Sequence, residues 1–362
     1  MSILKRLFGT KQEPIRTYND FWKWFQENER GFFKAVKNHK NIEKEFFDKL
    51  SPKLNELQDG FFYLTGMLDD NTVELILTPD GNIKNIVFVE ELVHAAPAIP
   101  GWTFTSLKPP VDIKNVQLDM AGYTHDSDSL SFYPNDVKDY PDEIDITIVH
   151  KDYNEDDKSS ITNGIYIFLD NFIGELNLVT TIDNVKVIGR GQAEKALIPI
   201  EKLRDFLLWR QKEFIEKYEG TLQNTDTAEF AILEAELENG NKLIATINRD
   251  ILNWDKKASH PWIATLEIQY DGQFKGMPDE TTYQLLNEIE EKALEQLKDA
   301  DGYLNIGRQT ADNSREVYFA CKDFRKPSKV LHQLTKDYPS INIQYDIYKD
   351  KYWRSFNRFN SN

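Results

Sequence analysis

The chain has 362 residues, 40% of them hydrophobic, and carries 44 lysines and arginines against 60 aspartates and glutamates, a formal net charge of −16 at pH 7. This composition is too apolar for wholesale disorder, and its surplus of acid disfavours nucleic acid as a partner. One cysteine, Cys321, excludes an internal disulfide and a cysteine-rich zinc site, and no run approaches the roughly 20 apolar residues of a membrane span. We therefore expect a cytoplasmic protein of two or three domains.

Residues 1–16 are expected to form an N-terminal tail. Basic Lys5 and Arg6 stand there among apolar side chains. A short amphipathic turn at a membrane surface is one interpretation, and a frayed terminus or docking peptide is the plainer one.

Aromatic side chains dominate the first predicted helix, Thr17–Val36. Asn19 or Asp20 can cap its start. Six large aromatics in twenty residues exceed what one helix face needs. Trp22 and Trp24 are therefore candidates for an interface, although packing inside the domain explains them equally well.

Hydrophobic periodicity then predicts alternating helices and strands up to a polar stretch near residues 219–226. Helices are expected over 41–57, 89–98, 161–176 and 199–218, and strands over 61–68, 72–78, 102–107, 117–121, 129–132, 143–150 and 184–188. Within this region, residues 135–160 hold nine acidic and three basic side chains. We place the main boundary at this polar stretch, between an N-terminal domain, 17–220, and a C-terminal domain, 221–362.

The C-terminal domain reads as strand, helix, strand, strand, helix, strand from Trp262 to Tyr348. Asp279 is a suitable cap for the first helix, and the turn residues at 311–314 predict a hairpin between the two central strands. Two further strands, joined by an Asn-Gly turn, precede this order. The order fits a ferredoxin-like βαββαβ fold with an added N-terminal hairpin.

The N-terminal domain shows a related pattern, because residues 60–75 match 302–317 in their turn residues and both follow an amphipathic helix. An ancient duplication would explain the match. Turn residues that ferredoxin-like units share for physical reasons alone would explain it equally well. The expected fold class is α+β, with two similar domains of helices and antiparallel sheet.

Three short motifs carry a family resemblance: GYLNIGRQT from Gly302, REVYFACKDF from Arg315 and YWRSF from Tyr352. In their spacing, the region from about Ala228 to Phe359 resembles a bacterial family, the domain of unknown function 695 family. That family is similar in outline to the regulator of ribonuclease E activity, protein B. The resemblance implies a ferredoxin-like fold and a protein-binding regulator as the nearest understood relative, and it supplies no catalytic residue.

Basic and aromatic residues gather in the same region, and Phe324–Asn362 carries eight basic and three acidic side chains. Because arginine, tryptophan and tyrosine dominate protein interfaces, this cluster predicts a binding surface. A solvated face with a tail packed on the sheet is the plainer alternative. The candidate binding residues are Arg308, Arg315, Asp323, Arg325, Tyr352, Trp353 and Arg354, together with Trp22 and Trp24.

Other constellations point more weakly to chemistry. The carboxylates of Glu288, Glu290, Glu291 and Glu295 could hold a metal, but a solvent-facing charged stripe is the expected role. The run His125–Asp128 has the residue types of a metal or phosphohydrolase site without any partner spacing, so a turn is expected there. Cys321 is expected to be a small packed residue rather than a nucleophile.

We therefore predict a non-catalytic protein-binding or regulatory module, with another protein as its partner and with no cofactor, metal site or catalytic residue. A metal-dependent hydrolase or nuclease using Asp126 and Asp128 is one alternative. An immunity-type inhibitor of a basic toxin is another, because strong acidity would steer such a partner.

Overall fold

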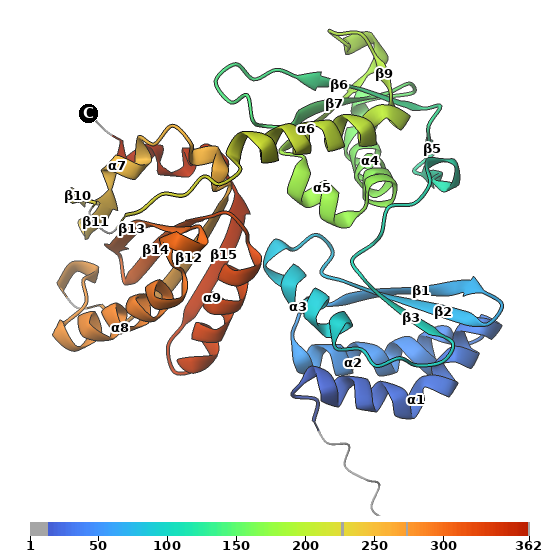
Figure 1. Cartoon of the computed structure of the whole chain (residues 1–362), viewed down its shortest axis with the longest axis horizontal. Coiled ribbons are helices and arrows are strands. Elements are labelled where there is room, and N and C mark those ends of the chain that lie inside the picture. The colour runs from blue at the N-terminus through green and yellow to red at the C-terminus, as the bar shows by residue number, and fades with distance from the viewer. Residues whose placement is uncertain (1–13, 226–227, 273, 361–362) are drawn as a thin grey trace, which may run out of the picture. The chain divides into compact units, whose positions relative to one another are not determined.

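The computed structural model describes residues 14–225, 228–272 and 274–360 (Figure 1). They divide between Pro109 and Pro110 into two compact units. The fold class is α+β, as predicted. The boundary expected at residues 220 and 221 falls inside the second unit and stays a proposal, and most of the predicted tail lies outside the described residues. No helix in the described ranges is long and apolar enough to cross a membrane.

The first unit packs its helices against a three-stranded sheet of order β1-β2-β3. Strands β1 and β2 pair antiparallel. Strands β2 and β3 pair in parallel, and a helix connects them in the chain. Its elements are α1 (Tyr18–Asn38), a π-helical turn (Glu43–Phe47), α2 (Asp48–Leu57), β1 (Phe62–Asp69), β2 (Thr72–Thr78), α3 (Ile83–His94) and β3 (Trp102–Ser106).

The aromatic first helix forms the core of this unit. Its N-cap is Thr17 rather than Asn19 or Asp20, because Asp20 sits three residues inside the helix and completes a capping box with Thr17. Trp22 packs against Phe104 with ring centroids 4.5 Å apart, and Phe25 packs edge-on against Trp102. Tertiary packing inside the unit thus accounts for the aromatic load.

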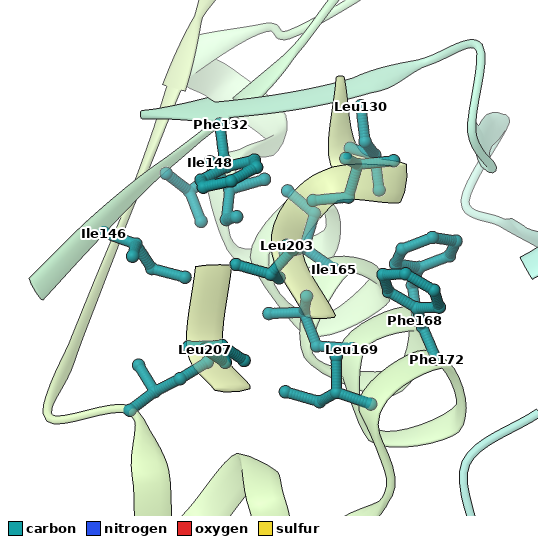
Figure 2. Packing of buried hydrophobic residues seen from close by; sticks show 14 of the residues in the cluster. Leu130, Phe132, Ile146, Ile148, Ile165, Phe168, Leu169, Phe172, Leu203 and Leu207 are labelled. Carbon is teal, nitrogen blue, oxygen red and sulfur yellow. The ribbon is translucent and has the colours of Figure 1, made fainter. Parts of the chain in front are cut away.

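The first part of the second unit is a sheet of order β8-β7-β6-β9. Its elements are β4 (Leu118–Met120), β5 (Tyr123–His125), β6 (Leu130–Asn135), β7 (Asp145–His150), α4 (Lys158–Ile173), α5 (Glu175–Thr181), β8 (Asn184–Gly189), β9 (Ile198–Pro199) and α6 (Leu203–Tyr218). Gly174, at φ 83°, divides α4 from α5, where one continuous helix was predicted. Figure 2 shows the core, in which side chains of α4 and α6 meet those of β6 and β7.

The last part of the chain holds a six-stranded sheet of order β10-β11-β13-β14-β12-β15, and all its neighbouring strands are antiparallel. Its elements are β10 (Phe230–Glu236), β11 (Lys242–Asn248), α7 (Arg249–Leu252), β12 (Trp262–Gln269), α8 (Glu280–Gln296), β13 (Tyr303–Ala311), β14 (Ser314–Cys321), α9 (Arg325–Asp337), β15 (Ile343–Lys349) and a final 3-10 helix (Arg354–Phe359). The order of elements from β12 to β15 is the predicted one, and the ferredoxin-like assignment stays a prediction.

Different elements cover the two faces of this sheet. Helices α8 and α9 lie on one face (Figure 1), where α9 packs on β12 and β15 and α8 bonds to β13 and β14. The other face carries a core that Ile251 of α7, Phe356 of the C-terminal 3-10 helix and the preceding Trp353 complete. Helices α8 and α9 cover β13, β14, β12 and β15. On the same face, side chains of β10 and β11 therefore remain accessible.

Candidate functional site

Two strands and one helix bring a pair of arginines together on the helix-bearing face of the six-stranded sheet. Arg308 follows a bulge in β13, and Arg315 is the second residue of β14. Gly307 makes the bulge at φ 134°, and a side-chain carbon there would collide with the carbonyl oxygen of Thr246 on β11. Only glycine fits this close approach, which directs Arg308 toward α8.

Arg315 is held from three sides. Its Nη1 donates to Oδ1 of Asn287 on α8 at 2.7 Å, and its Nε donates to Oγ1 of Thr310 at 3.2 Å. The guanidinium lies 5.0 Å from the ring centre of Tyr283, within range of a cation–π contact. With 1% of its side chain exposed, Arg315 is an almost fully buried cation.

A single carboxylate faces both arginines. Oε2 of Glu290 accepts from Nη1 of Arg308 at 2.9 Å and lies 3.5 Å from Nη1 of Arg315. Burial lowers the pKa of Arg315, Glu290 raises it, and neighbouring Arg308 lowers it again. Nη2 of Arg315 has no hydrogen-bond acceptor among the residues that the structure describes. The cluster therefore carries one positive charge and at least one donor in excess.

These arginines line a cavity of about 430 Å³, which we call the arginine pocket. Its walls combine the two guanidiniums and two threonine hydroxyls with apolar and aromatic side chains. The lining residues are Ile232, Ile244, Thr246, Met277, Pro278, Tyr283, Arg308, Thr310 and Arg315. A pocket of this size with a few convergent polar groups is typical of a binding site, and guanidinium forks match carboxylate or phosphate oxygens. The pocket can thus hold an anionic group attached to an apolar one.

Tyr352 and Arg354, also predicted as binding residues, lie far along the chain from this pocket's residues and bind another segment of the same unit. Nη2 of Arg354 is 2.7 Å from Oε1 of Glu143, and the Tyr352 hydroxyl donates to Oδ2 of Asp142 at 2.7 Å. Asp142 and Glu143 belong to the acidic stretch 135–160. The acidic stretch and the basic C-terminal run therefore pair with each other.

Two lysines, with 13% and 6% of their side chains exposed, extend this contact. Nζ of Lys349 is 2.8 Å from Oδ1 of Asp183, and Nζ of Lys351 is 2.7 Å from its Oδ2. Burial lowers the pKa of Lys349 to about 8, against the opposing pull of Asp183. Burial alone would raise the pKa of Asp142, but hydrogen bonds from Lys217, Tyr352 and Tyr218 outweigh it and hold this pKa below its usual value. We call this cluster the ion-pair joint; it comprises Asp142, Glu143, Asp183, Lys217, Tyr218, Lys349, Lys351, Tyr352 and Arg354.

The remaining predicted binding residues have structural roles. Trp353 is buried and donates its Nε1–H to the carbonyl of His260, and Trp22 donates in the same way to Leu92. Trp24 is buried in the core of the first unit. Their indoles are enclosed, so none of the three presents its ring to a partner.

Asp323 and Arg325 form a local pair at the start of α9. Oδ1 of Asp323 accepts from the backbone N–H of Arg325 at 2.7 Å, and Oδ2 is 3.1 Å from Arg325 Nη1. Both follow the end of β14, whereas Arg315 stands at its beginning. They therefore take no part in the arginine pocket.

The run His125–Asp128 forms the expected turn. Oδ1 of Asp126 accepts from the backbone N–H groups of Asp128 and Ser129, at 3.1 and 2.8 Å. His125 is fully buried, and burial followed by the nearby His150 lowers its pKa. Among the described residues, no group of three or more histidine, cysteine, aspartate or glutamate side chains is placed to hold a metal ion.

Glu290 and Tyr283 are site residues that the sequence reasoning missed. Glu290 was expected on a solvent-facing stripe, but only 5% of the residue is exposed. A signal was present, because Glu290 falls four residues after Leu286 and three before Ala293, both in the apolar stripe of α8. A carboxylate at a core position of a helix indicates a buried cationic partner.

No curated protein and no solved structure shows a significant match to the chain. The resemblance of the three short motifs to the 695 family is confirmed, because a family model matches a region that contains every lining residue of the arginine pocket except Ile232. Residues 234–360, the C-terminal part of the chain, match the family described as "Family of unknown function (DUF695)".

Proposed function

We propose that the C-terminal part of the chain is a protein-binding module that docks a partner through an acidic group placed in the arginine pocket. The observation that carries this proposal is the imbalance of charge: two guanidiniums, one of them almost fully buried, share one carboxylate at the wall of an open cavity. Burying a cation without full pairing costs stability, and an incoming carboxylate would supply the missing acceptor.

The pocket walls favour a protein rather than a bare ion. Ile232 is 68% exposed and Tyr283 is 39% exposed, and both stand beside the guanidiniums. An acidic residue next to an apolar residue on a partner would fill both parts of this surface. Arginine and tyrosine are also common among the residues that dominate binding energy at protein interfaces.

The two alternatives receive less support. In the hydrolase or nuclease alternative, Oδ1 of Asp126 already accepts two backbone hydrogen bonds within a turn. For the toxin-inhibitor alternative, part of the acid that would attract a basic partner, Asp142, Glu143 and Asp183, is paired within the chain.

The test is affinity purification of the full-length protein from its native cells at low and high salt, alongside two variants. Arg308→Gln removes a pocket cation that is 28% exposed, and Arg30→Gln removes a cation that is 93% exposed as a matched control. We expect a recurrent partner that high salt and Arg308→Gln both release and that Arg30→Gln retains. The purified partner should then bind directly, and recovery that is equal with Arg308→Gln would overturn the proposal.

A further inference from the structure

The helix-bearing face of the six-stranded sheet is covered over only part of its width. Helix α9 packs on β12 and β15, and α8 is bonded to β13 and β14. On the same face of the two remaining strands, Phe230 and Ile232 of β10 are 37% and 68% exposed. These two large apolar side chains stand at alternate positions of one strand and form a short apolar strip. Its Phe230 end also lines a hollow with Leu294 and Leu297 at the end of α8.

The dimensions of this strip suit one helix. Neighbouring strands lie about 4.8 Å apart, and an α-helix with its side chains is about 10 Å wide, so one helix covers about two strands. Helices α8 and α9 cover four strands in this proportion. The uncovered face of β10 and β11 is therefore a position for a third helix beside α8.

The arginine pocket opens onto this third position. Ile232 of β10 is opposite Thr246 of β11, and Thr246 is opposite Arg308 of β13, so the three residues form a row across the strands. An acidic side chain on a helix above β10 and β11 would reach Arg308 and Arg315 along this row. Toward the β10–β11 turn, the same face of β10 continues with Glu234 and Glu236, which favour a basic residue at that end of the helix.

We propose that the occupant is an amphipathic α-helix of a partner protein, lying beside α8 on the face of β10 and β11. Its apolar stripe would cover Phe230, Ile232 and Ile244, and an aspartate or glutamate next to that stripe would enter the arginine pocket. This inference rests on the proposed function and adds the form of the partner segment. Recognition then depends on a helix with apolar residues at i, i+3 or i+4, and i+7.

An extended segment does not satisfy the same contacts. β10 is an edge strand, and a peptide paired to it would lie on the far side of β10 from the pocket. Two strands, β10 and β11, would then separate its backbone from β13, about 14 Å in all at the usual strand spacing. A carboxylate side chain cannot span that distance, so the charge excess would remain without an acceptor.

The test is selection from a random 20-residue peptide display library on the full-length protein, without assuming a partner. Selected peptides are measured by fluorescence anisotropy against wild type, Arg308→Gln, Ile232→Glu and a matched Ile215→Glu control. Ile232 and Ile215 are 68% and 62% exposed, so both substitutions leave the cores intact. Circular dichroism of the bound and free peptide then reports its conformation.

We expect selected peptides with an apolar helical stripe and one flanking acid, helicity that rises on binding, and affinity about ten-fold or more weaker for Arg308→Gln and Ile232→Glu only. Peptides that depend on Arg308 but stay extended would overturn the proposal that the partner segment is helical. They would leave the proposed function standing. If no selected peptide depends on Arg308 or Ile232, the proposed function and the helix are both overturned.

Discussion

The arginine pocket and the ion-pair joint are built from the same kinds of side chain, and each holds one cation more than it holds carboxylates. They differ in how closely each cation is paired. In the joint, Asp142, Glu143 and Asp183 face Lys217, Lys349, Lys351 and Arg354, and each of these four cations has a carboxylate within 2.8 Å. In the pocket, Glu290 alone faces Arg308 and Arg315, at 2.9 and 3.5 Å.

The closeness of this pairing decides what each cluster can do. Every cation of the joint is paired at close range within the chain, so its charges hold two segments of the second unit together. The pocket retains a demand for an acceptor and has a cavity in which to receive one. A buried ionic cluster thus indicates a structural contact when each cation is closely paired within the chain. It indicates a binding site when a cation is incompletely paired beside a cavity.

The largest effect is expected from opening the joint at its centre. Asp183→Ala would remove the carboxylate that both Lys349 and Lys351 contact, and it would remove the acceptor of the Ile144 N–H. We expect the free energy of unfolding of the second unit to fall by about 3–5 kcal/mol, as when one partner of a buried pair is removed. Denaturant titration followed by circular dichroism measures it.

Asp136→Ala is the matched control for that experiment, because Asp136 pairs with Lys195 at 3.3 Å while 95% of its side chain is exposed. It should change the unfolding free energy little. An equal loss for both substitutions would show that the joint contributes no more than a surface pair.

Lys349 makes the joint sensitive to alkaline pH. Its pKa is lowered to about 8, below the value of the unfolded chain, so the unfolded state binds more protons between about pH 8 and 10.5. Stability from this group therefore rises with pH across that window, by at most roughly 3 kcal/mol. Lys349→Met should remove this rise.

The measurement is the difference in unfolding free energy between wild type and Lys349→Met from pH 7 to 10. Taking the difference is necessary because the raised pKa of buried Cys321 works in the opposite sense. A difference that does not vary with pH would mean that Lys349 keeps an ordinary pKa in the folded protein.

Gly307→Ala tests whether the bulge positions the pocket. A methyl group there would press on the Thr246 carbonyl at a φ that L-residues rarely adopt. We expect a loss of about 1–3 kcal/mol in unfolding free energy, together with loss of the Arg308-dependent binding. Gly66→Ala, which meets open space in β1, is the control and should be neutral or slightly stabilising. A stable Gly307→Ala protein that still binds would refute the role of the bulge.

Local chemistry allowed much of the C-terminal fold to be predicted. Asp312 and Asn313 adopt left-handed geometry in the two-residue turn of the β13–β14 hairpin, as their side chains favour. Asp279 caps α8, because its side chain accepts from the Thr282 N–H. These features depend on neighbours within a few residues, and such neighbours can be read from the chain directly.

The roles of the charged and aromatic residues depend on partners distant in sequence. Tyr352 and Arg354 resemble interface residues by type, yet Asp142 and Glu143, some 210 residues earlier, satisfy them. Arg308 and Arg315 were identified together, but neither the bulge at Gly307 nor the burial of Glu290 could be derived without knowing which strands pair. Composition located both clusters. It could not tell in which of them every cation is closely paired within the chain.

The smallest expected effect on stability comes from adding a carboxylate to the arginine pocket by substitution. Thr246 is opposite Arg308 on the neighbouring strand, so Thr246→Glu would place a carboxylate beside the unbalanced guanidiniums. A cross-strand pair of opposite charges adds about 0.2–1 kcal/mol, and the pocket should lose its affinity for acidic partners at the same time. Ala235→Glu adds the same charge to the opposite face of β10 and should preserve binding. Thermal unfolding and anisotropy measure the two effects. If Thr246→Glu still binds an acidic partner like wild type, the charge excess of the pocket is not what recognises it, and the contrast between pocket and joint loses its functional meaning.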